Sequence, residues 1–259
     1  MNYNNILTEK ADGIFTITIN RPDKLNALNY ETIQEIGMAV RFANDDDDVR
    51  GILLTGSGEK AFAAGADISE FAAFSFEEAE KLSRDGNRVF TSIEQSKKPV
   101  VAAINGFALG GGCELAMSCQ IRVASETARF GQPEVNLGLT PGYAGTQRLV
   151  QLVGKGKALE FLMTADMIPA AEAHRLGLVN HVVPQAELIA KAKEILTKIG
   201  TKAPLAIAAV IRCVNSHFAF DEDGFETEIR EFAGCFQSED FKEGTQAFLE
   251  KRKAIFKGA

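Results

Sequence analysis

The chain has 259 residues and a mass of 28.0 kDa, with 28 Lys and Arg against 35 Asp and Glu, which gives a formal charge of −7. A chain of this length can bury a sizeable core. Its hydrophobic fraction of 46% and mean hydropathy of −0.04 exclude a disordered chain, because such chains are poorer in apolar residues. The sequence pI near 5.2 argues against a protein that coats nucleic acid or an anionic membrane with its whole surface.

Four cysteines and three histidines limit the metal and redox chemistry of the chain. No CxxC, HExxH or HxH spacing occurs, so we expect no metal site, and free buried thiols in a reducing compartment. The segment Met1 to Asn5 shows no basic region followed by an apolar one, so we expect no secretory signal. The most apolar stretch, 99–117, is interrupted by Asn105 and Glu114. We therefore expect no membrane-spanning helix and a cytoplasmic location.

The first hundred residues alternate between strand and helix patterns. Over 13–20, apolar residues alternate with threonine, which indicates a half-buried strand. Asn29 can cap a helix whose apolar residues recur at helical spacing. The acidic run 45–48 reads as a solvated turn rather than a metal site. The pattern then predicts a strand, a Gly- and Ala-rich loop, a mostly polar helix and a buried strand, at 49–55, 56–67, 77–96 and 99–104.

The second part of the chain shifts from alternating patterns to helices. A Gly-rich loop over 106–112, a helix that begins at Cys113, a strand over 120–124 and a Gly- and Pro-rich loop over 131–145 come first. Beyond about residue 146 helices dominate, with a short strand near 178–183 and a helix over 170–176 that Gly177 ends. After Pro204 we predict helices only, to about Val214, over 222–236, and from the Ser238 cap to Phe256. This order predicts an α/β core with a helical tail.

Two of the glycine-rich loops could hold a ligand through backbone N–H groups. They contain no GxGxxG, P-loop or GxSxG pattern, so nucleotide hydrolysis and serine hydrolysis have little support. The loop 110–112 leads into a helix, and the loop that ends at Asp67 follows a strand, so both leave amides free to point at a ligand. Together they could form an oxyanion hole. Alternatively, the small residues only let the backbone pack closely.

Two carboxylates accompany these loops. Glu114 lies in an otherwise apolar stretch, a poor place for a charge unless the charge is used or paired. Glu134 follows Pro133 in a loop of mixed Gly, Pro and apolar residues. Two carboxyls in low-dielectric surroundings can hold different protonation states, one as acid and one as base. From spacing alone, a buried ion pair for Glu114 and a surface charge for Glu134 are the better explanations.

Several short runs of sequence form a specific combination. They are N-R-P-D-K-L-N-A-L at 20–28, F-A-A-G-A-D-I at 62–68, N-G-F-A-L-G-G-G-C-E-L-A at 105–116, F-G-Q-P-E at 130–134, G-T-Q-R-L at 145–149 and E-K-R-K at 250–253. With these motifs the chain resembles the enoyl-CoA hydratase (crotonase) family over nearly its whole length. The resemblance implies an α/β fold, a spiral of ββα units over 1–200, followed by a helical trimerisation region over 201–259. It also implies a homo-oligomer, a trimer or a dimer of trimers.

The resemblance implies the roles of the candidate catalytic residues. The N–H groups of Ala66 and Gly111 would hold the carbonyl oxygen of an acyl-CoA thioester, and Glu114 and Glu134 would flank the α- and β-carbons of its acyl chain. Glu114 would activate water as a base, and Glu134 would deliver a proton to Cα. Their division of labour stays open, because the pair can titrate as one unit. The implied reaction is the reversible hydration of a short-chain trans-2-enoyl-CoA, with CoA as part of the substrate and no metal or redox cofactor.

Further positions match the substrate pocket of the family. The residues that the resemblance places around adenine, pantetheine and the acyl group are Lys24, Ala27, Leu28, Ala64, Asp67, Ile68, Gly142, Lys253 and Phe256. The last two match a tail that closes the pocket, in the family often from a neighbouring subunit. For Phe256, plain helix packing is an equal alternative. Residues 71–90 are expected to border the acyl pocket, whose chain-length preference the sequence does not reveal.

Other functions remain as alternatives. Both glutamates are present, as in family members that act as hydratases, whereas isomerases, dehalogenases and hydrolases usually lack one or place their acids elsewhere. An enoyl-CoA isomerase is the alternative within the family. A non-catalytic CoA-binding or RNA-binding member is the alternative outside catalysis, although RNA binding needs a concentrated basic surface and the predicted helix 77–96 mixes both signs. We therefore expect an acyl-CoA substrate and copies of the chain as partners, with no nucleic acid and no membrane.

Overall fold

The computed structural model describes residues 3–219 and 221–259, with the backbone alone at Phe71. Met1 and Asn2, which enter the expectation about a secretory signal, lie outside the described residues. Within the described residues the strands form two sheets. In spatial order the larger contains β1 (Ile6–Ala11), β2 (Ile14–Ile19), β3 (Gly51–Gly56), β5 (Val100–Ile104), β7 (Ile121–Ser125) and β10 (His181–Val183). The smaller contains β4 (Ala61–Ala64), β6 (Phe107–Leu109), β8 (Arg129–Gly131) and β9 (Ile168–Pro169).

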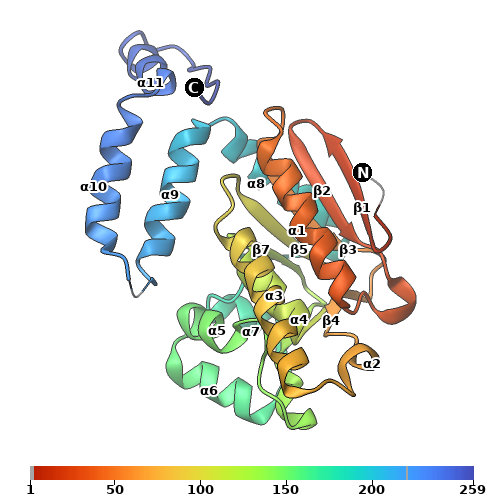
Figure 1. The fold of residues 1–259 in the computed structure, drawn as a ribbon. Coiled ribbons are helices and arrows are strands. Elements are labelled where there is room, and N and C mark those ends of the chain that lie inside the picture. The colour runs from red at the N-terminus through yellow and green to blue at the C-terminus, as the bar shows by residue number, and fades with distance from the viewer. Residues whose placement is uncertain (1–2, 220) are drawn as a thin grey trace.

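Helices connect these strands and make up the C-terminal end (Figure 1). Those between the strands are α1 (Tyr30–Asp45), α2 (Ile68–Phe71), α3 (Phe76–Glu94), α4 (Gly111–Ser118), α5 (Gly145–Val153), α6 (Lys155–Thr164) and α7 (Ala170–Arg175). After the last strand come α8 (Leu188–Gly200), α9 (Pro204–Ser216), α10 (Gly224–Cys235) and α11 (Glu239–Leu249). Short 3-10 turns are η1 (Pro22–Lys24), η2 (Pro133–Leu137) and η3 (Gln185–Glu187). The predicted caps are confirmed, because Asn29 accepts from the N–H of Thr32 and Ser238 from that of Phe241.

Both faces of the central strands of the larger sheet are buried. β2, β3, β5, β7 and β10 run parallel, and β1 is antiparallel to β2. Because side chains alternate across a strand, Ile52 and Leu54 join the core that contains residues of α1, whereas Leu53 joins the core formed with α8. Parallel strands covered on both faces read as continuous apolar runs. This explains why β3 and β5 were recognisable from sequence.

The chain spirals between the two sheets. β3 is followed by β4, β5 by β6 and β7 by β8, so each turn places one strand in the larger sheet and the next in the smaller one. A helix or a 3-10 turn follows each pair: α2 and α3, then α4, then η2 and α5. The ββα arrangement expected from the resemblance is thus present. Its consequence is that the ends of β4, β6 and β8, with the loops after them, lie next to each other.

The strands of the smaller sheet were not predicted. The expected loop 56–67 contains β4, and the expected loop 106–112 contains β6 and the first two residues of α4, which begins at Gly111 instead of Cys113. β8 and β9 were missed, and so was β1. The four strands of the smaller sheet have only two to four residues each. Segments that short cannot display a period of two, and their Gly and Ala content reads as loop.

The last helix is shorter than predicted. α11 ends at Leu249, not at Phe256, and Lys251 has a positive φ of 56°. The chain then folds back, and the N–H groups of Lys257 and Gly258 donate to the carboxylate of Asp240 at 2.7 and 2.8 Å. The prediction of a helix up to Phe256 was therefore wrong. The charged run 250–253 contains no glycine or proline that would mark a helix end in the sequence.

Helices α9 to α11 extend away from the sheets (Figure 1). α9 packs against α10, and large apolar side chains on this extension are open to solvent, with Phe225 86% and Phe248 82% exposed. Across residues 3–219 and 221–259, no helix has both the length and the apolar character that crossing a bilayer requires. The expected division into 1–200 and 201–259 stays a prediction.

Candidate active site

Helix α4 carries Glu114 into the interior. All eight residues of α4 are buried, and Glu114 is only 1% exposed. Gly112 permits this placement, since a Cβ there would lie 1.9 Å from the carbonyl oxygen of Ala63 in β4. A carboxyl group held so deeply must have hydrogen-bond partners or lose its charge. The predicted burial of Glu114 is confirmed.

Two backbone amides, one from the loop before α5 and one from its first residue, bind Glu114. Its Oε1 accepts from the N–H of Tyr143 at 2.8 Å and from the N–H of Gly145 at 2.7 Å. Burial and then the charge of Glu134 raise the pKa of Glu114 to about 7, while the two amides and Arg148 act in the opposite direction. The partners are thus amides rather than the ion pair that spacing alone favoured. A carboxyl with a pKa near neutrality is suited to proton transfer.

Glu134 lies on η2 beside the glycine-rich loop. It is half-buried, and burial raises the pKa of its carboxyl. The amide of Gln132, in the orientation that satisfies its neighbours, donates to both carboxylate oxygens of Glu134 at 3.0 and 3.1 Å. Gly110 has a φ of +47°, and a Cβ there would lie 2.8 Å from Oε1 of Glu134. Glu134 therefore faces the start of α4 rather than bulk solvent.

The loops that carry Ala66 and Gly111 come together. A Cβ on Gly110 would lie 3.8 Å from the Cα of Gly65, which places the residues before the two candidate amides side by side. Ala66 forms a parallel bridge with Leu28, and the hydrogen bonds of that bridge use the N–H groups of Leu28 and Asp67. Within the described chain the N–H of Ala66 donates to no protein group. The N–H of Gly111 belongs to the first turn of α4, where no carbonyl of the helix is available.

The structure brings together most of the candidate CoA-binding residues. Asp67 pairs with Arg21 and Lys24, each at 2.9 Å, and these ion pairs with the Ser69 hydroxyl hold the pKa of Asp67 far below its usual range. The bridge between Leu28 and Ala66 joins the same two segments, which also contain Ala27, Ala64 and Ile68. Leu28 is buried, whereas Lys24 is 55% exposed. Because Lys24 is largely exposed, its ammonium group can contact a ligand as well as Asp67.

The two candidates near the C-terminus lie elsewhere in this chain. Phe256 packs against Gly244 of α11, where a Cβ would lie 3.2 Å from its ring, and its carbonyl accepts from Arg50 at 3.4 Å. The segment after α11 is at the opposite end of the molecule from α2 (Figure 1). Within one chain, Lys253 and Phe256 therefore do not join the residues around Asp67. Their assignment to the substrate pocket stays a prediction that requires a neighbouring copy.

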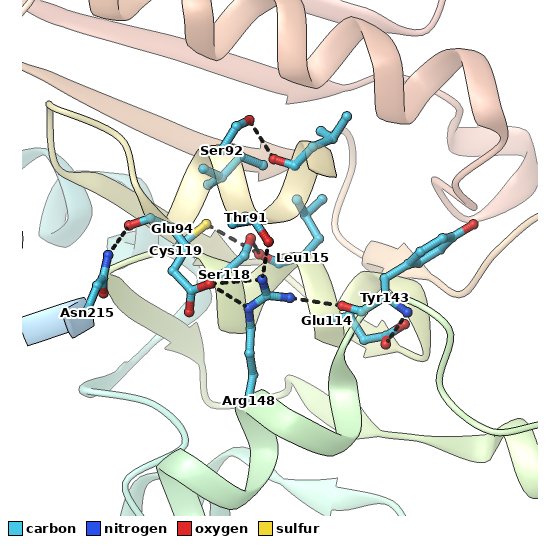
Figure 2. A network of polar contacts seen from close by, with 12 residues as sticks. Thr91, Ser92, Glu94, Glu114, Leu115, Ser118, Cys119, Tyr143, Arg148 and Asn215 are labelled. Carbon is cyan, nitrogen blue, oxygen red and sulfur yellow. Dashed lines mark hydrogen bonds and ion pairs between the residues drawn. The ribbon is translucent and has the colours of Figure 1, made fainter. Parts of the chain in front are cut away.

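Behind Glu114, a buried arginine orders the same loop (Figure 2). Arg148 of α5 donates to the carbonyl of Tyr143 at 2.9 Å and forms an ion pair with Glu94 of α3 at 2.9 Å. Asn215 of α9 donates to the backbone carbonyl of Glu94 at 2.8 Å. A continuous series of polar contacts thus runs from α9 through Arg148 to the peptide beside Glu114.

Sequence reasoning missed the groups that hold Glu114. The amides of Tyr143 and Gly145 leave no side-chain signature, so no pattern could assign them. Arg148 was noticed only as part of a motif, although a charged residue in an apolar helical stretch is a usable signal for a buried pair. Gly142, a predicted substrate-binding residue, is half-buried, and its carbonyl accepts from Ser83 and Asn87 of α3. No pattern in the α3 sequence pointed to this contact.

The arrangement combines two carboxyls of raised pKa with two free amides. One carboxyl can take a proton and the other can give one, while the amides can stabilise negative charge on a carbonyl oxygen. Among the described residues, no group of three or more His, Cys, Asp and Glu side chains is placed to share a metal ion. The chemistry that these residues supply is proton transfer next to an activated carbonyl group.

Known proteins are similar to this chain in sequence and in fold. The chain is 50% identical to the short-chain-enoyl-CoA hydratase of Clostridium acetobutylicum, over 98% of this chain and 97% of the relative. It is also 50% identical to the crotonyl-CoA hydratase of Syntrophomonas wolfei, over 99% of each. The crystal structure of an enoyl-CoA hydratase from Bacillus anthracis superposes with a TM-score of 0.92 at 37% identity, and covers 99% of this chain and 100% of that one. The predicted crotonase-like fold is therefore confirmed.

The sequence model of one family matches nearly the whole chain. It is the model for enoyl-CoA hydratase/isomerase, and it matches residues 9–259. That range contains Glu114 and Glu134, both free amides and the segments that meet at Asp67. With the two relatives of 50% identity and the shared fold, this match settles the question of ancestry. The chain belongs to the enoyl-CoA hydratase/isomerase family.

Proposed function

We propose that the protein is a short-chain enoyl-CoA hydratase, which adds water reversibly across the 2,3 double bond of a trans-2-enoyl-CoA to give a 3-hydroxyacyl-CoA. The observation that carries the proposal is the pairing of two protonatable glutamates, Glu114 and Glu134, with the free N–H groups of Ala66 and Gly111. The names of the two relatives of 50% identity, a short-chain-enoyl-CoA hydratase and a crotonyl-CoA hydratase, support the same reaction.

The amides account for activation of the substrate. When the N–H groups of Ala66 and Gly111 bind the thioester oxygen, they draw electrons from the double bond and make Cβ electrophilic. Negative charge reaches the oxygen only as the enolate forms, so the amides bind the transition state better than the ground state. Gly111 adds the positive end of α4 to this interaction.

The two glutamates account for the proton transfers. Glu114 takes a proton from water while the water oxygen bonds to Cβ and the π electrons move toward the thioester oxygen. Glu134 then gives its proton to Cα as the enolate collapses, so one molecule of water has been added. Proton exchange between the carboxyls or with solvent restores the starting state. Two amides and Arg148 favour the ionised form of Glu114, which supports its role as the base.

The remaining residues bind the CoA part and assemble the protein. Lys24, exposed beside Asp67, would contact the anionic CoA moiety, with Ala27, Leu28, Ala64 and Ile68 around it. The tail with Lys253 and Phe256 would close the pocket of a neighbouring copy. The exposed phenylalanines of α10 and α11 favour assembly through residues 201–259 into a trimer or a dimer of trimers.

We propose that the reaction needs no metal or redox cofactor, because water addition is redox-neutral and backbone amides can stabilise the enolate charge. A cytoplasmic location fits the four cysteines, which are all unpaired. We expect no nucleic acid and no membrane among the partners.

The test is hydration of crotonyl-CoA by the purified protein. The reaction is monitored through the loss of absorbance of the conjugated enoyl thioester. Glu114→Gln and Glu134→Gln should each lower kcat by at least about a hundredfold, the usual contribution of a general acid or base, and leave the circular dichroism spectrum unchanged. Product analysis with a 3-enoyl-CoA distinguishes the isomerase, which would shift the double bond without adding water. Near-normal hydration by either variant would overturn the proposal.

A further inference from the structure

The loop that binds Glu114 is held by side chains that do not touch Glu114. The carbonyl oxygen of Gly142 accepts from the hydroxyl of Ser83 at 2.6 Å and from Nδ2 of Asn87 at 2.9 Å. Ser83 and Asn87 are one helical turn apart on α3, so both project from the same face of that helix. Asn87 Nδ2 also donates to the backbone carbonyl of Ser83 at 3.0 Å, so both of its hydrogens are engaged.

The accepting carbonyl belongs to the peptide unit that binds the carboxylate. The C=O of Gly142 and the N–H of Tyr143 are the two ends of one planar group, and that N–H donates to Glu114 at 2.8 Å. Fixing the oxygen therefore fixes the direction of the N–H. A hydrogen bond to the carbonyl also polarises the amide and makes its N–H a better donor.

The packing around this peptide leaves it little freedom. A Cβ on Gly86, which lies between Ser83 and Asn87 on α3, would lie 2.3 Å from Cε1 of Tyr143. The Tyr143 ring also packs edge-on against Phe90, with ring centres 5.3 Å apart. α3 thus comes closest to the loop at Gly86, and Ser83 and Asn87 on either side of this glycine donate the two hydrogen bonds to the Gly142 carbonyl. The carbonyl of Tyr143 itself is held by Arg148.

We propose that Ser83 and Asn87 are positioning residues for Glu114, because they orient the 142–143 peptide so that its N–H stabilises the carboxylate form of that side chain. The inference rests on the proposed function in one respect, namely that Glu114 acts as the base. It assigns a role to two residues of α3 that neither touch the reacting atoms nor belong to the sequence motifs. The role is to keep Glu114 ionised at the pH of catalysis.

Other charged groups face Glu114, and the test must leave them unchanged. Glu134 raises the pKa of Glu114 and Arg148 lowers it. Glu94 pairs with Arg148, and the buried Cys113 and Tyr143 feel the charge of Glu114. Ser83→Ala and Asn87→Ala alter none of these groups. A change in the titration of Glu114 in these variants therefore reports on the peptide.

The experiment compares the pH profiles of kcat/KM for crotonyl-CoA between pH 5 and 9. In Ser83→Ala and in Asn87→Ala, the midpoint of the acidic limb should move to higher pH by roughly half a unit to one unit. At pH values below the midpoint, kcat/KM should therefore be about three- to tenfold lower than in the parent protein. Ser83→Thr keeps the hydroxyl and should retain the parent midpoint. Ser92→Ala is the matched control, since Ser92 is exposed on the same helix and donates only to the carbonyl of Val89.

A second measurement separates this inference from the proposed function. The Glu114 carboxyl is titrated by infrared difference spectroscopy, with Glu114→Gln in the same background as the blank. If the pKa of the Glu114 carboxyl is higher in Ser83→Ala or Asn87→Ala than in the parent protein, the positioning role is supported. Failure of the parent protein to hydrate crotonyl-CoA would overturn only the proposed function and would leave this inference standing. The inference is overturned if Ser83→Ala and Asn87→Ala have the same acidic-limb midpoint and the same Glu114 pKa as Ser92→Ala, while their melting temperatures fall. In that case the hydrogen bonds to the Gly142 carbonyl only anchor the loop.

Discussion

Gly145 leaves no room for a methyl group beside Glu114, and this gives a sharp test of how that carboxyl is held. A Cβ at position 145 would lie 2.8 Å from Oε1 of Glu114 and 2.9 Å from Cβ of Pro141. In Gly145→Ala the carboxylate must therefore shift, and it loses the 2.7 Å hydrogen bond from the N–H of Gly145. A hydrogen bond to a charged group contributes about 1.5–3 kcal/mol, so kcat/KM should fall roughly 10- to 150-fold.

The assay is steady-state hydration of crotonyl-CoA together with a thermal melt. Gly156→Ala in α6 is the matched control, because a Cβ there meets nothing within 4 Å. It should retain activity and gain up to about 1 kcal/mol of stability from the helix preference of alanine. Activity of Gly145→Ala within twofold of the parent would refute the reasoning that the two amides set the position of Glu114.

Three further predictions follow from the same site. Gly111→Pro removes one amide donor at the first position of α4, where proline is tolerated. The value of kcat should therefore fall about 10²- to 10³-fold, and a loss below tenfold in steady-state assays would contradict the proposed role of the Gly111 amide. Folding raises the pKa of Glu114 from 4.5 to about 7, so its ionisation favours the unfolded chain, and the free energy of unfolding should fall by about 3 kcal/mol between those pH values. Urea unfolding should show this slope, and Glu114→Gln should remove it. Lys24→Ala should raise KM about two- to fivefold at unchanged kcat, and an effect that does not shrink with added salt would contradict electrostatic binding.

Most of the larger sheet was predictable because its central strands are long enough to carry a pattern, whereas β1, which is exposed along most of its length, was missed. β2 shows alternation over six residues, and β3 and β5 are apolar runs of six and five residues. The smaller sheet was not, although it positions the loops that carry the candidate catalytic groups. Its strands depend on close approaches such as that of Gly112 to Ala63, which involve residues distant in sequence. Local patterns carry no information about such contacts.

The candidate site divides in the same way. The candidate catalytic side chains, Glu114 and Glu134, were noticed as carboxyls in apolar or glycine-rich surroundings, but spacing alone favoured an ion pair and a surface charge, and only the family resemblance supplied catalytic roles. Their environment did not stand out, because the amides that bind Glu114 lie about 30 residues downstream and are backbone groups. The end of α11 was mispredicted for a related reason. The helix is followed by Lys251 at positive φ, and Asp240 binds the returning tail; neither feature is visible in a local sequence pattern.

The complete burial of α4 has an evolutionary consequence. This helix contributes both Glu114 and the Gly111 amide, and each of its eight residues packs in the interior, so almost any substitution there alters the stability of the fold as well as the reaction. We therefore expect few substitutions in α4 to be tolerated. We expect substitutions to be tolerated better at the start of α3, where Phe76 is 78% exposed. One segment of the fold is thus closely packed on all sides, while another has room to accept different side chains.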